Sequence, residues 1–157
     1  MFDVPGDMLT NDRGTDPTFA PSEKLYRRFP PEHYKGGMKI PIYAVELPDV
    51  SVNRSKHGGK AEYVLYDVVK GTYREHFGIV EFSVGDIPNP IPLENQTRVE
   101  TKVSHEPELL NYFHSEIQAH DEVRGHLKNI EEDIDEEWVA AWRVKMRRAL
   151  TVVKKPG

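Results

Sequence analysis

The sequence predicts an α+β fold, in which a small and mainly antiparallel sheet is packed by two C-terminal helices. Three observations predict it. Apolar and polar residues alternate along 77–87 and 97–103, which is typical of strands with one buried face. Apolar residues recur at helical spacing after Pro107 and again after Asp133. Residues 1–37 are instead rich in proline and glycine, and they predict an irregular N-terminal arm.

Residues 1–37 hold five prolines and four glycines, so neither a long helix nor a central strand is expected there. The one regular element predicted in this arm is a short helical turn over 22–28, with Ser22 as its N-cap. The arm is expected to lie on the domain or on a partner, or to be partly disordered. Residues 38–157 are expected to form a single α+β domain.

The expected strands follow the arm. Residues 38–47 predict a strand, which Pro41 places at a sheet edge or near the start of the strand. Residues 49–54 predict a short extended segment with alternating faces, and 55–60 predict a loop. The stretch 61–69 fits a short buried strand and a helical turn equally well, because periodicity alone does not separate them.

Two helices are expected to complete the chain. Pro107 suits the first position of a helix, where its missing N–H has no intrahelical partner to lose. That helix is expected to end or bend near Asn129. The second is expected to begin at Asp133, where Glu136 three residues later approximates a capping box, and to cover one apolar face as far as Val153.

Composition excludes several classes of protein. The chain has 157 residues and no cysteine, which excludes a disulfide framework, a thiolate metal site and a cysteine nucleophile. No apolar run approaches the roughly 18 residues that cross a bilayer. We therefore expect a cytoplasmic protein with no membrane partner.

The formal net charge of −5 conceals an uneven distribution. Residues 22–60 carry +4, residues 61–142 carry −12 and residues 143–157 carry +6. The two basic stretches predict contact with an anionic partner such as a nucleic acid, or they face the acidic middle of the same chain. On this pattern the candidate binding residues are Arg27, Arg28, Arg143 and Arg147.

Two histidines suggest chemistry. His105 is expected at the end of a strand, and His114 at the edge of a helical face. Two histidines beside a cation can cleave a phosphodiester, one taking the attacking proton while the other protonates the leaving group. Arg54 or Lys56 is the candidate cation. The same residues also fit a polar helix entry and a surface loop with no catalytic role.

A metal site is the weaker alternative. Glu116 and His120 have the four-residue spacing that places two ligands on one helix face. A buried, hydrogen-bonded structural role for His120 explains the same spacing. His114 lies six residues before His120, which does not match the HExxH zinc motif. We therefore expect no metal and no cofactor.

Ser51 and Asn53 complete the candidate binding residues, since they lie in an extended segment just before a loop. The same side chains also suit turn hydrogen bonds. No P-loop, GxGxxG or GxSxG motif is present. The sequence thus favours a small cytoplasmic binding or accessory module that docks on a protein or nucleic-acid partner. The alternative is a metal-independent phosphodiesterase or ribonuclease, which requires His105, His114 and Arg54 to meet in one open cleft.

Overall fold

The protein is built around an antiparallel sheet of seven strands. Its computed structural model describes residues 2–34, 49–89, 99–121, 125–127 and 136–157. The strands of the sheet are β1 (Lys24–Phe29), β2 (Asp49–Arg54), β5 (Gly78–Ser83), β6 (Val99–His105), β7 (His114–Asp121), β8 (Gly125–His126) and β9 (Thr151–Lys154). The other described elements are the helix α2 (Glu136–Ala149), the hairpin strands β3 (Tyr66–Asp67) and β4 (Thr72–Tyr73), and the 3-10 helices η1 (Gly6–Met8), η2 (Pro31–His33), η4 (Ala61–Leu65) and η5 (Val84–Asp86).

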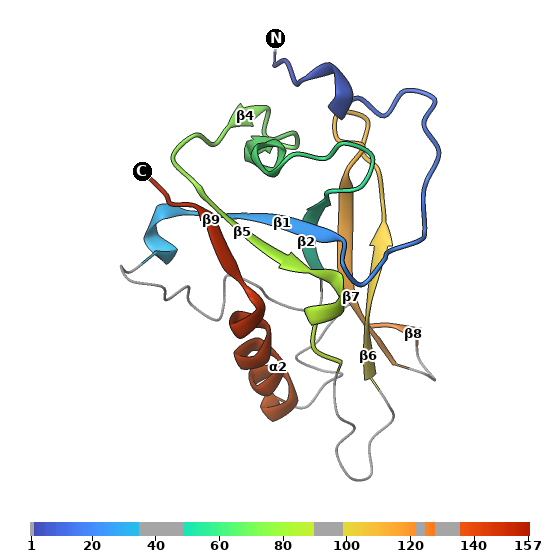
Figure 1. Cartoon of the computed structure of the whole chain (residues 1–157), viewed down its shortest axis with the longest axis vertical. Helices are drawn as coiled ribbons and strands as arrows, with labels where there is room; N and C mark the ends of the chain where they lie inside the picture. The colour runs from blue at the N-terminus through green and yellow to red at the C-terminus, as the bar shows by residue number, and fades with distance from the viewer. Residues whose placement is uncertain (1, 35–48, 90–98, 122–124, 128–135) are drawn as a thin grey trace.

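The strand order is β6, β7, β2, β1, β5, β9, and β8 pairs with β7. Every neighbouring pair is antiparallel. Strand β1 therefore lies inside the sheet between β2 and β5, although it is the first strand described in the chain. Figure 1 shows α2 at one end of the molecule, and η4 with β4 at the other end.

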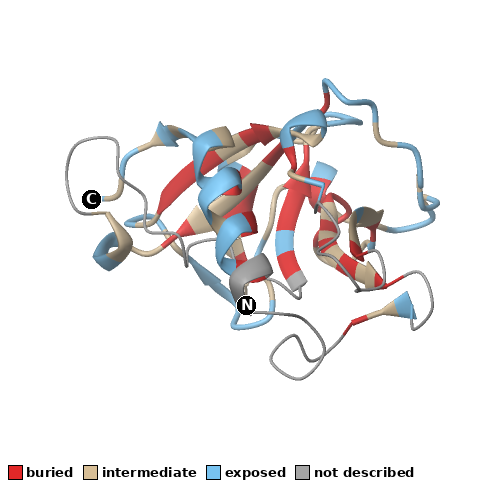
Figure 2. Ribbon diagram, turned by 90° about the horizontal axis from the view of Figure 1, so that it is seen from below, coloured by how far each residue is buried: buried red, intermediate tan, exposed pale blue. Residues whose placement is uncertain are grey.

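One face of the sheet forms the main core, because side chains alternate between the two faces along each strand. Helix α2 covers this face with buried side chains, and the indole Nε1 of Trp142 donates to the carbonyl of Pro88 at 3.0 Å. Figure 2 shows the buried residues following the strands, while much of the surface of α2 is exposed. The buried core members are Leu25, Phe29, Val50, Val52, Val80, Phe82, Ile87, Val99, Ile117, Ala119, Leu127, Val139, Trp142 and Met146.

The opposite face carries a smaller core at β5 and polar groups at β2. Ile79 neighbours Val80 in the strand and so points away from the main core. It packs with Val64 and Leu65 of η4, and all three side chains are buried. Over β2 the same face bears polar residues such as Ser51. This polar part of the sheet holds the cavity described below.

The helix predicted from Pro107 is wrong, because the chain makes a turn there and then forms β7. Along β7, buried and partly exposed residues alternate with a period of two. Ile117 and Ala119 are fully buried two positions apart, whereas Leu109, which the helical face required inside, is 78% exposed. The described structure is therefore mostly sheet with a single α-helix, rather than a sheet packed by two C-terminal helices.

The helical turn predicted over 22–28 is also wrong, since these residues enter β1. Leu25 and Phe29 are buried in the main core, and the hydrogen bonds of the strand come from β2 and β5. Before β1 the chain runs irregularly along the domain, with Met8 fully buried. We call residues 2–20 the strap. The predicted boundary between arm and domain lies within 35–48, outside the described residues.

The remaining element predictions fare better. Residues 49–54 are extended as predicted, the predicted strand 77–87 shortens to β5 followed by η5, and 97–103 contributes to β6. The ambiguous stretch 61–69 begins as a helical turn, η4. The strand predicted over 38–47 lies outside the described residues.

The predicted C-terminal helix is confirmed as α2, but it ends at Ala149 and the chain continues as β9. Residues 151–154 pair with β5, so Val153 belongs to a strand and not to the helix. No helix in the described part of the chain is long and apolar enough to span a membrane.

Candidate functional site

The two candidate catalytic histidines lie on opposite faces of the sheet. His105 pairs with Ser115 across β6 and β7, whereas His114 pairs with Asn53 across β7 and β2. Neighbouring residues of a strand point to opposite faces, so His105 shares a face with Ser115 while His114 faces away from it. Arg54 follows Asn53 in β2 and lies on the face of His105. The two histidines and Arg54 therefore do not meet in one cleft.

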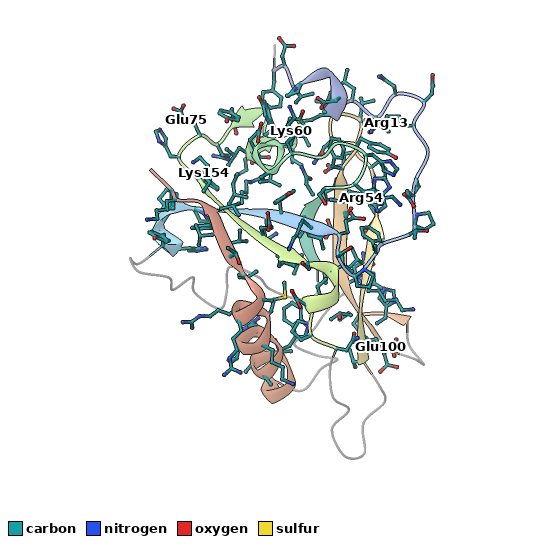
Figure 3. The ribbon with its side chains drawn as sticks, viewed as in Figure 1. Arg13, Arg54, Lys60, Glu75, Glu100 and Lys154 are labelled. Atoms are coloured by element: carbon teal, nitrogen blue, oxygen red, sulfur yellow. The ribbon has the colours of Figure 1, made fainter. Side chains whose placement is uncertain are left out.

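Arg54 is completely buried and holds the strap against the sheet. Its guanidinium binds both carboxylate oxygens of Glu23, with Nε 3.0 Å from Oε2 and Nη2 2.7 Å from Oε1. It also donates to the carbonyls of Asp16 at 2.6 Å and Thr18 at 2.7 Å, and it lies 4.0 Å from the ring centroid of Phe19. In Figure 3, Arg54 lies near the start of β7, on the side where the strap runs. These partners make Arg54 a structural cation.

His105 is buried, and both of its ring nitrogens bind backbone groups. Nδ1 accepts from the N–H of Asp16 at 2.9 Å, and Nε2 donates to the carbonyl of Tyr112 at 2.6 Å. This arrangement selects the neutral tautomer with its proton on Nε2. Burial lowers the pKa of His105, and the hydrogen bond to Tyr112 offsets part of that effect. While these two hydrogen bonds persist, neither ring nitrogen of His105 is available to exchange a proton with a substrate.

Lys56 also binds the strap. Its Nζ lies 2.8 Å from Oδ2 of Asp16, and Nε2 of His57 lies 2.8 Å from the same oxygen. Hydrogen bonds from Lys56, from a backbone N–H and from His57 hold the pKa of the Asp16 carboxyl well below its usual range. Arg54, Lys56 and His105 thus converge on Asp16, where their shared role is to hold the strap.

A cavity of about 380 Å³ opens on the polar side of the sheet, and we call it the cavity. Strands β1 and β2, the turn before β7, and the segment from η4 to β5 surround it. Among its lining residues are Glu108 and Asn111 from the turn, with aromatic surface from Tyr26, Tyr66 and Phe77. Five residues predicted from the sequence also line it, namely Arg27, Arg28, Ser51, Asn53 and His114.

Two buried amides at the cavity, Asn53 and Asn111, form a pair that is only partly satisfied. Their residues are 4% and 6% exposed, and Nδ2 of Asn111 donates to Oδ1 of Asn53 at 2.8 Å. Nδ2 of Asn53 and Oδ1 of Asn111 have no hydrogen-bond partner. If both side-chain amides are rotated by 180°, so that N and O exchange places, one donor and one acceptor still lack a hydrogen-bond partner. Buried polar groups without partners are rare in native proteins, so this amide pair requires an explanation.

His114 forms an ion pair with Glu116 beside the cavity. Its Nε2 lies 2.9 Å from Oε1 of Glu116, and its Nδ1 lies 2.7 Å from the carbonyl of Glu106. Burial lowers the pKa of His114, but the hydrogen bonds with Glu116 and Glu106 outweigh burial and raise it overall. Burial raises the pKa of Glu116, but hydrogen bonds from His114 and Ser51 lower it overall. Both directions favour the charged forms.

Ser51 does not complete a catalytic triad with this pair. Its Oγ donates to Oε1 of Glu116 at 2.8 Å and lies 3.1 Å from Nε2 of His114. In a serine triad the acid binds the imidazole nitrogen opposite the serine. Here Glu116 and Ser51 share Nε2, and the hydroxyl proton of Ser51 points to the carboxylate. Ser51 is therefore a hydrogen-bonding group at the cavity and not an activated nucleophile.

Two arginines bring positive charge to the cavity. Nη1 of Arg27 donates to a backbone carbonyl of β2 at 2.7 Å. Nη1 of Arg28 donates to the carbonyl of Val64 at 2.9 Å, and its Nη2 lies 3.4 Å from Oδ2 of Asp67. Arg74 binds the same oxygen at 3.1 Å. Arg28 therefore fastens the η4 segment to the sheet, and Arg27 of β1 binds the backbone of β2.

The remaining candidates lie elsewhere. Arg143 and Arg147 belong to α2, where Arg147 is exposed, and neither lines the cavity. Among the described residues, no group of three histidine or acidic side chains is placed to hold a metal ion. His120 stacks on His126 with ring centroids 5.3 Å apart.

The cavity residues that the sequence analysis missed are Asn111 and Glu108. Both lie in the turn before β7, where a helix was predicted. The sequence does contain a signal for this turn. Pro107 and Asn111 are turn-forming residues, and they enclose a short segment between two stretches of alternating residues. Glu108 and Asn111 close this turn with reciprocal backbone hydrogen bonds of 3.0 Å.

The pKa values of the two histidines should be shifted in opposite directions. In a ring-proton NMR titration of the folded protein, the pKa of His114 should lie above 6.5 and that of His105 below it. A raised pKa means that the contribution of His114 to stability is present at low pH and is lost as the pH rises through that pKa. The contribution of His105 is lost as the pH falls. The reverse order of the two pKa values would contradict these environments.

Comparison with known proteins adds no candidate role. A scan against protein-family models, a search of curated proteins and a search of solved structures each found no match. The functional argument therefore rests on the residues of this chain.

Proposed function

We propose that this chain is a non-catalytic binding module that docks on a partner protein by taking a short segment of the partner into the cavity. The observation that carries the proposal is the amide pair of Asn53 and Asn111. A buried donor and a buried acceptor without partners destabilise the folded protein by about 1–3 kcal/mol each. A ligand that supplies an acceptor and a donor at the cavity would remove that penalty.

A protein partner suits the surroundings of the cavity better than a nucleic acid does. Val69 lines the cavity and is 84% exposed, and Leu109, next to the lining residue Glu108, is 78% exposed. These are the two most exposed large apolar side chains of the described residues, and apolar surface beside a pocket is typical of protein contacts. The acids Asp67 and Glu108 also line the cavity, which disfavours a chain of phosphates.

Binding without catalysis is supported by what the candidate catalytic groups already do. Arg54, Lys56 and His105 hold the strap, and His114 is paired with Glu116. The roles of Arg27, Arg28, Ser51 and Asn53 in binding are part of this proposal. A cytoplasmic location remains a proposal too, and the absence of cysteine is consistent with it.

The double variant Asn53→Leu/Asn111→Leu tests the proposal. Leucine has the branched shape of asparagine but neither donates nor accepts. In affinity selection with mass spectrometry, the probe is a pool of N-acetylated tripeptides with random side chains, half as free acids and half as amides. The wild-type protein should retain peptides from this pool, and the double variant should retain at least about tenfold less, because each lost hydrogen bond contributes roughly a factor of ten.

Arg147→Gln on α2 is the matched control, since it changes an exposed residue outside the cavity and should leave retention unchanged. A parallel pool of random RNA tetranucleotides distinguishes the other partner class. The proposal is contradicted if no peptide is retained, if the double variant retains peptides as well as the wild type, or if RNA is retained in preference or cleaved.

A further inference from the structure

The amide pair also indicates which chemical group of a partner the cavity takes. Among the described residues that line the cavity, the buried side-chain atoms without a hydrogen-bond partner are Nδ2 of Asn53, a donor, and Oδ1 of Asn111, an acceptor. A complementary group must therefore present one acceptor and one donor close together. A carboxamide has this set in its C=O and NH₂ groups.

A ligand carboxamide would complete a ring of three amides. In the free protein, Nδ2 of Asn111 donates to Oδ1 of Asn53 at 2.8 Å. The ligand oxygen would accept from Nδ2 of Asn53, and the ligand NH₂ would donate to Oδ1 of Asn111. Each of the three amides then donates one hydrogen bond and accepts one. Both buried groups gain partners, which removes the penalty of leaving them unpaired.

The position of the pair favours a side-chain carboxamide over a main-chain peptide group. The two unpartnered atoms are buried, and their residues are 4% and 6% exposed, so a ligand group has to enter the cavity to reach them. A main-chain peptide group has chain on both sides, whereas the carboxamide of glutamine or asparagine ends a flexible stem. A volume of about 380 Å³ lies at the small end of ligand pockets and suits one side chain. The rings of Tyr26, Tyr66 and Phe77 line the cavity and suit the methylene groups of such a stem.

The same two atoms disfavour the side chains that are closest in shape to a carboxamide. A carboxylate has no N–H to donate, so glutamate or aspartate would leave Oδ1 of Asn111 unpaired beside a negative charge. Methionine or leucine would leave both buried groups unpaired. A site that hydrogen-bonds its ligand rejects analogues lacking the matching group, because the buried polar groups of the site then have no partner.

We propose that the cavity binds a glutamine or asparagine side chain of the partner segment, with its carboxamide hydrogen-bonded to Asn53 and Asn111. This inference rests on the proposed function and adds the chemistry of the residue that enters the cavity. Recognition depends on the hydrogen bonds of a neutral group and not on the net charge of the cavity. The flanking residues of the segment then contact the exposed side chains of Val69 and Leu109.

Three matched pools of N-acetylated tripeptides test the inference by the same affinity selection. Their central residues are glutamine and asparagine, glutamate and aspartate, or methionine and leucine, and their outer positions are random but exclude glutamine and asparagine. All the peptides end in an N-methylamide, so that the central side chain carries the only primary carboxamide. The wild-type protein should retain the first pool at least about tenfold more than either other pool, because each lost hydrogen bond contributes roughly a factor of ten.

The double variant Asn53→Leu/Asn111→Leu should retain all three pools equally weakly, and the control Arg147→Gln should keep the preference of the wild type. Equal retention of the three pools by the wild-type protein would overturn the inference, and so would a preference for the carboxylate or the apolar pool. In these cases the proposed function still holds if the double variant loses the peptides. A preference for the carboxamide pool that survives in the double variant contradicts both the inference and the proposed function. If the wild-type protein retains no pool, both fail as well.

Discussion

Replacing Arg54 by methionine should lower the free energy of unfolding by about 3–5 kcal/mol, the usual effect of removing one partner from a buried ion pair. Arg54 is fully buried and Glu23 is 8% exposed, so the variant leaves a buried carboxylate without its cation. The carbonyls of Asp16 and Thr18 lose their donor as well. Urea titration followed by tryptophan fluorescence measures the change.

The variant should also release the part of the strap around Asp16 and Thr18. This part binds the rest of the protein through Arg54, Lys56 and His105, whereas Met8 and Arg13 have contacts of their own with Tyr112. Limited trypsin digestion should therefore cut after Arg13 sooner in Arg54→Met than in the wild type. A faster cut in Arg54→Met with an unchanged rate in Arg147→Met separates release of the strap from a general effect of losing a cation.

Two controls make the stability prediction specific. The double variant Arg54→Met/Glu23→Leu removes both charges and should recover part of the loss, since apolar replacements of a buried pair are often tolerated. Arg147→Met removes an exposed arginine from α2 and should change stability by about 0.5 kcal/mol or less. A loss below about 1 kcal/mol in Arg54→Met would show that the buried pair does not hold this region together.

For the amide pair, replacing both asparagines together should not lower the stability of the protein, whereas replacing either one alone should. Asn53→Leu alone leaves the amide of Asn111 without any partner, and Asn111→Leu does the same to Asn53. Each single variant should lose about 1–3 kcal/mol of stability. The double variant removes every polar group of the pair, so it should be at least as stable as the wild type.

This double-mutant cycle separates a binding group from a structural one. Strong non-additivity, with the double variant more stable than either single variant, is expected because the two amides depend on each other. Additive losses would mean that each amide has its own satisfied partners. A pair that lowers stability and is needed for peptide binding fits the general trade between stability and function at binding sites.

Local patterns in the sequence were sufficient for some elements. Residues 49–54 and the core of 77–87 are strands because their apolar residues alternate, and α2 is helical because its apolar residues recur at helical spacing. In these segments the buried face matches the period of the local backbone. Local propensity and the contacts made in the folded protein therefore agree.

Two other elements depend on contacts that local patterns do not contain. Residues 24–29 form a central strand because β2 and β5 pair with both of its edges. The stretch after Pro107 contains apolar residues that match a helical face, but strand pairing with β6 and β2 stabilises β7 instead. Pairing between distant segments overrides local propensity in both cases.

The residues of the candidate site could be predicted only in part from local sequence patterns. Arg27 and Arg28 were chosen by charge, Ser51 and Asn53 by their place in an extended segment, and all four line the cavity. Asn111 was missed because its turn was taken for a helix. His105 and His114 were grouped because both were expected at one helix entry, but they lie on β6 and β7 and face opposite sides of the sheet.

The central claim is that the amide pair is the recognition element of the cavity, and the side-chain NH₂ signals of Asn53 and Asn111 report on it directly. They can be followed by ¹⁵N NMR during titration with the pool of N-acetylated tripeptides, with assignments from the two single Leu variants. Both signals should shift and saturate together. Unchanged amide signals, with shifts confined to α2 and its arginines Arg143 and Arg147, would contradict the claim and place binding on the basic helix.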